Sequence, residues 1–213
     1  SSFSKVVRHG NSPKNYWWEV TDKNGTRYFY GGDPDNGVDE NATLSDANAN
    51  KAHWCMKETR DMNGNFVRYQ YRKVEDVGVE GGTVAGYQIY IEKITYTGYN
   101  TEEGKYAVLF KRDRELQNWK KRADVSINAN LGFKQVTADL LKKIEVQFEG
   151  KNIRSYELNY KRGEFFKTLL DSISEFDAGG KFFTSHKFEY YNDVSTGGNL
   201  KPFKTVENWT TNN

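Results

Sequence analysis

Cysteine, histidine and proline are scarce in this 213-residue sequence, and each scarcity narrows what the chain can be. Cys55 is the single cysteine, so the chain can hold neither an internal disulfide bond nor a zinc site built on cysteines. Because Cys55 stands between Trp54 and Met56 in a strand-like segment, we expect a half-buried thiol and not a nucleophile. The three prolines, against 19 glycines and 15% aromatic residues, are typical of strands joined by glycine-containing turns.

Long apolar runs and an excess of one charge are also missing. No stretch of about 18 apolar residues occurs, so no membrane-spanning helix is predicted. The formal net charge is only +2, far below the large positive charge that is typical of nucleic-acid binders. The densest basic segment, 111–122, is predicted to be solvated surface. The chain opens with Ser1 and has no signal-peptide core, so we expect a processed or excised piece whose targeting signal lies elsewhere.

Motifs of catalysis are absent as well. The histidines His9, His53 and His186 lie far apart, and none has the three- or four-residue spacing of helix-borne metal ligands. No nucleophile elbow, phosphate-binding loop or dinucleotide-binding glycine motif occurs. Glu102 and Glu103 fall in a turn-rich segment, where a glycosidase geometry is not implied. The sequence therefore predicts no enzyme, and no cofactor apart from the calcium candidate described below.

Two segments carry the strongest short-range signal of a β-hairpin. Asp-x-Asn-Gly occurs at 22–25 and again at 61–64, each time between aromatic, strand-like runs. Asn-Gly favours a type I′ turn, because both residues tolerate the positive φ angles that this turn requires. The shared order of Trp, Asp-x-Asn-Gly, an Arg-containing strand and Tyr-x-Tyr suggests a β repeat.

Further strands are indicated by period-two alternation of apolar and polar residues, clearest at 144–148 and 153–160. Segment 31–50 is predicted to be a long surface loop, and 137–142 to contain a helical turn. The fold class is all-β, with consecutive antiparallel hairpins forming a twisted meander, a sandwich or a shell-wall strip, and little helix. The predicted division is an N-terminal extension at 1–15, one β-rich domain at 16–192, and a polar tail or next module at 193–213.

Two groups of residues are candidates for binding. Asp33, Asp35 and Asp39 alternate around a glycine and could supply oxygens to calcium, but their spacing differs from an EF-hand loop, and a solvated acidic loop is favoured. Aromatic faces stack on sugars, so the exposed members of an aromatic strand cluster could bind glycans, while the others must form the core. The candidates for this role are Trp17, Trp18 and Trp54.

The ordered series of these motifs resembles a known family. The Asp-x-Asn-Gly turns followed by Tyr-x-Tyr resemble the tyrosine-aspartate repeats of RHS-type proteins. As a whole, the series is similar to the Salmonella virulence plasmid B protein family and to the B component of insecticidal Tc toxin complexes. The resemblance spans 16–192, and its matching stretches are 18–31, 61–71, 94–98, 108–110, 122–124, 141–146, 154–160 and 188–191.

The resemblance implies a non-catalytic, structural role in a secreted or cell-surface bacterial toxin assembly. The implied partners are neighbouring strands or modules of the full-length chain and an enclosed toxin polypeptide, around which the chain would form part of a β-sheet wall. No nucleic acid and no membrane span are implied. The alternative is a secreted β-sandwich binding module for glycan or protein ligands, which loss of glycan binding in Trp17→Ala or Trp54→Ala would favour.

Overall fold

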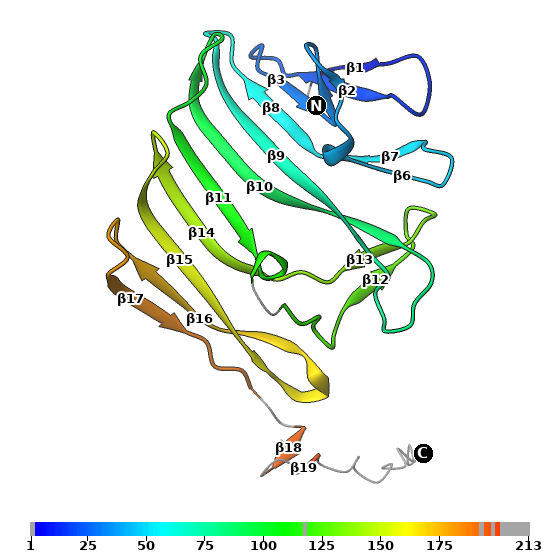
Figure 1. The fold of residues 1–213 in the computed structure, drawn as a ribbon. Helices are drawn as coiled ribbons and strands as arrows, with labels where there is room; N and C mark the ends of the chain where they lie inside the picture. Colours follow the sequence, from blue (N-terminus) through cyan, green and yellow to red (C-terminus); the bar gives the residue numbers. More distant parts are fainter. Residues whose placement is uncertain (1–2, 117–118, 192–193, 197–198, 201–213) are drawn as a thin grey trace, which may run out of the picture.

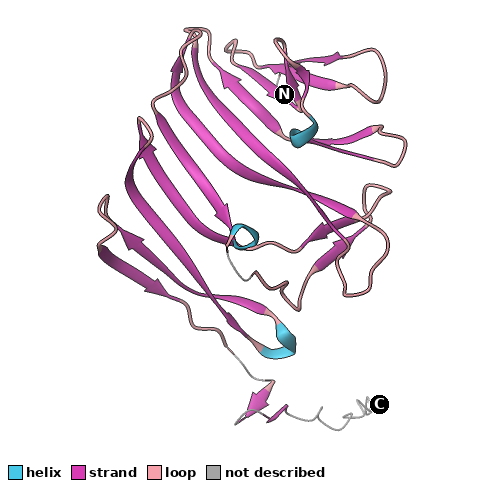
Figure 2. Ribbon diagram, viewed as in Figure 1, coloured by secondary structure: helices cyan, strands magenta, loops and turns pink. Residues whose placement is uncertain are grey.

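One long antiparallel sheet dominates the computed structural model, which describes residues 3–116, 119–191, 194–196 and 199–200 (Figure 1). The sheet has 13 strands, and its main path follows the chain in the order β1-β2-β3-β8-β9-β10-β11-β14-β15-β16-β17. Figure 2 shows that helix is confined to short single turns. The predicted all-β meander with little helix is therefore confirmed. The strands of the main path are β1 (Lys5–His9), β2 (Trp17–Thr21), β3 (Arg27–Tyr30), β8 (Met56–Arg60), β9 (Asn65–Asp76), β10 (Gly86–Tyr99), β11 (Tyr106–Arg112), β14 (Leu141–Phe148), β15 (Lys151–Arg162), β16 (Thr168–Phe176) and β17 (Phe182–Lys187).

Shorter elements complete the described chain. Strand β12 pairs with β13, which in turn joins the main sheet through a parallel bridge between Gln135 and Tyr87 on β10. In the part of the chain that the structure describes, no helix is long and apolar enough to cross a membrane. These elements are β4 (Gly32–Asp33), β5 (Gly37–Val38), β6 (Thr43–Ser45), β7 (Lys51–Trp54), β12 (Ser126–Asn128), β13 (Gln135–Thr137), β18 (Ser195–Thr196), β19 (Asn199–Leu200) and the 3-10 turns η1 (Glu40–Ala42), η2 (Asp113–Glu115) and η3 (Glu164–Phe166).

The predicted N-terminal extension, 1–15, contains a strand of the main sheet. Strand β1 lies within the predicted N-terminal extension and pairs with β2 along its whole length. The predicted tail, 193–213, lies outside the described residues except for 194–196 and 199–200.

Three hairpins of the main sheet, β2–β3, β8–β9 and β16–β17, share a turn built on aspartate. At the β2–β3 turn, Asp22 Oδ1 accepts hydrogen bonds from the backbone N–H groups of Asn24 (2.8 Å) and Thr26 (3.0 Å). Gly25 donates to the Asp22 carbonyl and alone in this turn has a positive φ, 81°. This is a type I turn followed by a left-handed glycine, so the predicted type I′ geometry at Asn-Gly is wrong.

The same aspartate-anchored turn recurs at the second Asp-x-Asn-Gly motif and at two turns that lack this motif. Asp61, Asp46 and Asp177 each accept hydrogen bonds from the N–H groups two and four residues ahead, in the β8–β9, β6–β7 and β16–β17 hairpins. The Oδ1 atom satisfies donors that the sheet leaves open, which explains why aspartate begins each turn. A true type I′ turn occurs instead at Glu149-Gly150, where both φ angles are positive (48° and 75°).

Long connections join other strands of the main sheet. The segment 31–50, predicted to be a long surface loop, instead contains strands β4, β5 and β6 and turn η1, and it buries Ala42, Thr43 and Leu44. The predicted helical turn at 137–142 is wrong too, because this segment links β13 to the start of β14 in extended form. Strands β4, β5 and β6 are only two or three residues long, too short to show the period-two alternation by which a strand is predicted.

The buried core lies where these connections cover the sheet. Strand β4 contacts β2, β3 and β8, and the most buried large side chains nearby are Phe29 (2% exposed) and Leu44 (1%). Phe66 on β9 packs over Gly98 on β10, where an added Cβ would lie 2.4 Å from the ring. The tight contact explains why only glycine fits at that position.

The region from β14 to β17 is built differently. Each of its strands makes its extensive contacts only with flanking strands, and every residue of β14 is half-buried. In Figure 1 this part of the described chain forms a single curved layer. Its few buried residues, Ser155, Leu158 and Ser172, include only one apolar side chain.

Candidate functional site

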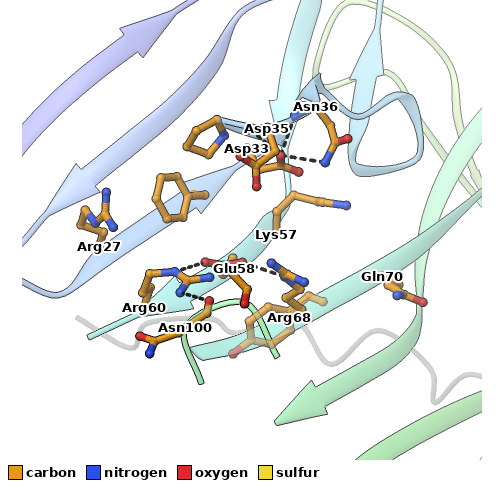
Figure 3. Close-up of a pocket in the computed structure, with 14 residues that line it drawn as sticks. Arg27, Asp33, Asp35, Asn36, Lys57, Glu58, Arg60, Arg68, Gln70 and Asn100 are labelled. Carbon is orange, nitrogen blue, oxygen red and sulfur yellow. Dashed lines mark hydrogen bonds and ion pairs between the residues drawn. The ribbon is translucent and has the colours of Figure 1, made fainter. Parts of the chain in front are cut away.

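A charged groove of about 620 Å³ lies between the β4–β5 hairpin and strands β3, β8 and β9 (Figure 3). Its lining combines cationic and acidic side chains from segments far apart in the sequence. They are Arg27, Lys57, Arg60 and Arg68 on the one hand and Asp33, Asp35 and Glu58 on the other.

Glu58 organises the floor of this groove. Its side chain is only 9% exposed, and its two oxygens accept hydrogen bonds from Arg60 Nε (2.6 Å) and Arg68 Nε (2.7 Å). Arg68 also donates to Glu103 (2.6 Å), and Arg60 donates to the carbonyl of Asn100 (2.8 Å). Burial alone would lower the pKa of Arg68, but the two carboxylates raise it above its ordinary value. The guanidinium groups are thus engaged within the chain, and they tie the β10–β11 turn to β8 and β9.

Two of the three predicted calcium ligands, Asp33 and Asp39, are already engaged with other groups of the chain. Asp33 Oδ1 accepts hydrogen bonds from the N–H groups of Asp35 (3.0 Å) and Asn36 (2.8 Å), which forms a local Asx turn. Asp39 caps turn η1 and forms an ion pair with Lys57. Among the described residues, no cluster of three or more His, Cys, Asp or Glu side chains could hold a metal ion.

The predicted sugar platform is also divided. Trp17 is 7% exposed and stacks on His9 at 3.8 Å, so it belongs to the core. Trp18 points to the other face of β2 and meets the ring of Trp54 edge to face at 5.8 Å. Trp54 Nε1 donates to the carbonyl of Tyr16 (2.7 Å). The structure therefore brings Trp18 and Trp54 together and separates them from Trp17.

Cys55 lies 3.5 Å from His53 through Sγ and Nε2. Burial and the nearby Asp39 carboxylate raise the pKa of the thiol to about 11. The thiol is therefore protonated at neutral pH, which is the unreactive form.

A buried cluster of charged side chains, which the sequence did not predict, joins β9 to the 113–140 connection. Arg114 Nη2 lies 2.6 Å from Asp76 and 2.6 Å from Asp139, whose side chains are 5% and 2% exposed. Lys121 Nζ binds Asp76 as well, at 2.5 Å. Burial alone would raise the pKa of Asp76, but the hydrogen bonds from Lys121 and Arg114 lower it to about 2. The prediction that 111–122 is simply solvated surface is wrong, because two of its cations fix the 113–140 connection to β9.

The two faces of the sheet from β10 to β16 differ in polarity. On one face, which we call the apolar face, Ile94, Val108 and Val146 stand opposite one another on β10, β11 and β14. An aromatic row runs beside them, with ring centroids 5.3 Å apart for Tyr96–Tyr106 and 4.8 Å apart for Tyr106–Phe148.

The other face, the polar face, carries charged and hydroxyl side chains. On this face Lys143 lies 3.4 Å from Glu145 and 3.7 Å from Glu157. Asn159 donates to Ser172 at 3.3 Å one row farther along the strands. The sheet is thus amphipathic, as the alternation at 144–148 and 153–160 predicted.

The fold places the chain among all-β modules built on one long antiparallel meander. A family model described as Salmonella virulence plasmid 65kDa B protein matches residues 2–121, which is more than half of the chain. The chain belongs to this family, and the predicted resemblance is confirmed. No curated protein matches the chain.

Solved structures share the fold at low sequence identity. The N-terminal domain of effector protein SpvB from Salmonella typhimurium strain LT2 is 18% identical, with a TM-score of 0.67 over 89% of this chain and 67% of that one. The crystal structure of TcdB2-TccC3-TEV is 15% identical, with a TM-score of 0.68 over 86% of this chain and 11% of that one. The Photorhabdus luminescens Tc holotoxin pore, mutation TccC3-D651A, is 16% identical, with a TM-score of 0.62 over 85% and 10%. The chain thus spans about a tenth of the Tc chains that it matches.

Proposed function

We propose that the chain is a non-catalytic structural module of a bacterial toxin-type assembly, where it forms part of a β-sheet wall around a toxic polypeptide. One observation carries the proposal. From β11 through β17, apart from the 113–140 connection, the described chain is a single sheet layer without a covering layer on either face. In a free-standing sandwich, a second sheet would bury one face of this sheet. In a wall, both faces can stay without a covering layer.

The edges of the sheet support the same role. Within the described residues, β1 and β17 each pair on one side only. Phe182 and Phe183 on β17 are 56% and 70% exposed, and the strand has no proline that would block pairing, although a register shift against β16 falls at Phe183. We infer that neighbouring strands of the full-length chain continue the sheet at these edges.

The pairing of charged side chains supports a non-catalytic role. Groups with a shifted pKa, such as Asp76 and Arg68, form hydrogen bonds that join strands and connections to one another. In the charged groove, Glu58 is paired with Arg60 and Arg68, and Lys57 is paired with Asp39. We propose a secreted or cell-surface location, in keeping with an effector and toxin family.

Protease protection tests enclosure directly. The full-length protein, purified with any polypeptide that accompanies it, is digested with proteinase K and the products are identified by mass spectrometry. We expect one segment to resist digestion, and to become sensitive at the denaturant concentration that unfolds the sheet. If every segment outside the sheet is digested at the same rate without denaturant, the proposal fails.

A further inference from the structure

Two arginines of the charged groove face each other across neighbouring strands. Arg27 on β3 lies directly opposite Arg60 on β8, and both side chains line the groove. Like charges at directly opposite positions destabilise a sheet. In the described part of the chain, the one carboxylate that pairs with Arg27 is that of Glu19, whose Oε1 lies 4.0 Å from Nη1. Arg27 therefore receives little compensation from the chain itself.

Arg60 is held in place and still has a nitrogen to offer. Its Nε donates to Glu58 Oε1 (2.6 Å) and its Nη1 donates to the carbonyl of Asn100 (2.8 Å), whereas its Nη2 makes no hydrogen bond within the described residues. The guanidinium of Arg27 makes none there either. Planar guanidinium groups with free N–H groups bind carboxylates through paired hydrogen bonds. A carboxylate between these two arginines would also relieve their repulsion.

Negative charge lines a different part of the same groove. Asp33 and Asp35 belong to the β4–β5 hairpin, and Figure 3 shows them apart from Arg27 and Arg60. Asp33 accepts hydrogen bonds only through Oδ1, and the carboxylate of Asp35 has no partner in the described chain. Neither acid forms an ion pair with the two arginines there. The groove thus offers free carboxylate oxygens at one end and free N–H groups at the other.

This separation of charge selects the class of ligand. The two aspartates repel a polyanion such as nucleic acid, and the arginines repel a simple cation. A short peptide with free termini carries a carboxylate at one end and an ammonium group at the other, so it matches both ends. The exposed side chains of Gln70 and Thr101 in the lining can bind peptide groups between them. The volume of about 620 Å³ falls within the roughly 300–1,000 Å³ of small-molecule sites.

We propose that the charged groove binds a short zwitterionic peptide. Its C-terminal carboxylate lies between Arg27 and Arg60, and its N-terminal ammonium group lies at Asp33 and Asp35. The floor is ordered before the ligand arrives, because the largely buried Glu58 already holds Arg60 by a hydrogen bond. Such order lowers the entropy cost of binding. Binding at this groove requires no role of the chain in a wall.

Titration calorimetry of the full-length protein with triglycine tests the site, because this peptide carries only its two terminal charges. We expect triglycine to bind, and to bind at least about tenfold more weakly to Arg27→Gln and to Asp35→Asn, since each change removes a charged partner. Asp35 is exposed and its side chain has no partner in the described chain, so Asp35→Asn keeps the fold even if Arg27→Gln does not. Arg8→Gln, at an exposed arginine of β1 outside the groove, is the control and should bind as the wild type does.

Altered ligands assign the two ends. Triglycine amide lacks the carboxylate and N-acetyltriglycine lacks the ammonium group, and each should bind at least about tenfold more weakly than triglycine. Arg27→Gln should remove the difference between triglycine and its amide, because the carboxylate has then lost its partner. Unchanged triglycine binding in Arg27→Gln overturns the site, and so does the absence of binding at millimolar triglycine. Inorganic phosphate that binds as tightly as triglycine overturns the zwitterionic ligand, since it would need no aspartate.

Discussion

The covered region of the sheet, β2, β3, β8 and β9, and the single-layer region, β14 to β17, are built from the same strand patterns but held in different ways. In the covered region, connections between strands fold back as hairpins and bury Phe29 and Leu44 almost completely. In the single-layer region, the connections are short and the side chains of β14 stay half-buried. Alternation of apolar and polar residues therefore does not by itself create a core. A core forms where the connections between strands fold back over one face of the sheet.

Phe29→Ala is the strongest way to break the covered region. A fully buried phenylalanine contributes about 3–5 kcal/mol to the free energy of unfolding, since its removal leaves a cavity. The matched change in the single-layer region, Val146→Ala, should cost about 1 kcal/mol or less, because the side chain is half-buried. Urea unfolding of both variants measures the difference. Equal losses would show that the single-layer region has a core of its own.

Arg114→Met tests the charge cluster that joins the 113–140 connection to the covered region. The substitution leaves Asp76 and Asp139 buried with fewer partners, and we expect a loss of about 1–3 kcal/mol. Arg162→Met, at an exposed arginine of β15 that stacks on the exposed ring of Phe166, is the control and should cost less, about 0.5 kcal/mol. A wild-type unfolding midpoint in Arg114→Met would contradict a role for this cluster in stability.

The same cluster predicts an acid-sensitive step. The pKa of Asp76 is lowered to about 2 from an ordinary 3.8, so its ionised form stabilises the fold above pH 3.8, and this stability is lost as the pH falls towards 2. The pKa of Asp124 is also lowered, chiefly through its hydrogen bond with Arg122, and Asp124 accepts hydrogen bonds from Thr168 on β16. The two carboxylates thus attach one connection to both regions.

Unfolding midpoints from pH 6 to pH 2 check this step. Asp76→Asn should remove on the order of 2 kcal/mol at pH 6 and flatten the pH dependence below 4. Asp139 has the opposite sign, since burial raises its pKa and its ionised form costs stability as the pH rises. A steeper loss of stability in acid for Asp76→Asn than for the wild type would refute the assignment.

Much of the fold could be predicted from the sequence because the signals are local. Alternation at 144–148 and 153–160 and the Asp-x-Asn-Gly turns fixed strands and hairpins before any partner was known. The β4–β5 and β6–β7 hairpins could not be predicted, because their strands are too short to show alternation. The pairing of Arg114 with Asp76 could not be predicted, because these residues are far apart in the sequence. The same limit applies to Trp17, since composition does not say which member of an aromatic cluster is buried.

The glycines of the aspartate-anchored turns have different surroundings in the two regions. Gly180, in the β16–β17 turn, has φ of 79° and open space around its Cα, so Gly180→Ala should cost only the left-handed backbone term, about 1–2 kcal/mol. Gly64, in the β8–β9 turn, has φ of 89°, and a Cβ there would lie 2.3 Å from Asn100 Oδ1. Gly64→Ala should therefore cost more than Gly180→Ala, which thermal unfolding would show. The reverse order would mean that the Asn100 side chain moves aside freely.

Ala49→Gly gives the smallest effect, and it is stabilising. Ala49 occupies the left-handed position of the β6–β7 turn with φ of 66°, where the other three aspartate-anchored turns have glycine. Relief of the strain is partly offset by the greater freedom of glycine in the unfolded chain, so we expect a gain of a few tenths to about 1 kcal/mol. Ala47→Gly, at an exposed residue of the same turn without positive φ, is the control and should lower stability slightly. Because Asp46 anchors this turn without an Asn-Gly pair, a gain at Ala49 alone would establish that aspartate sets the turn and that glycine only relieves its strain.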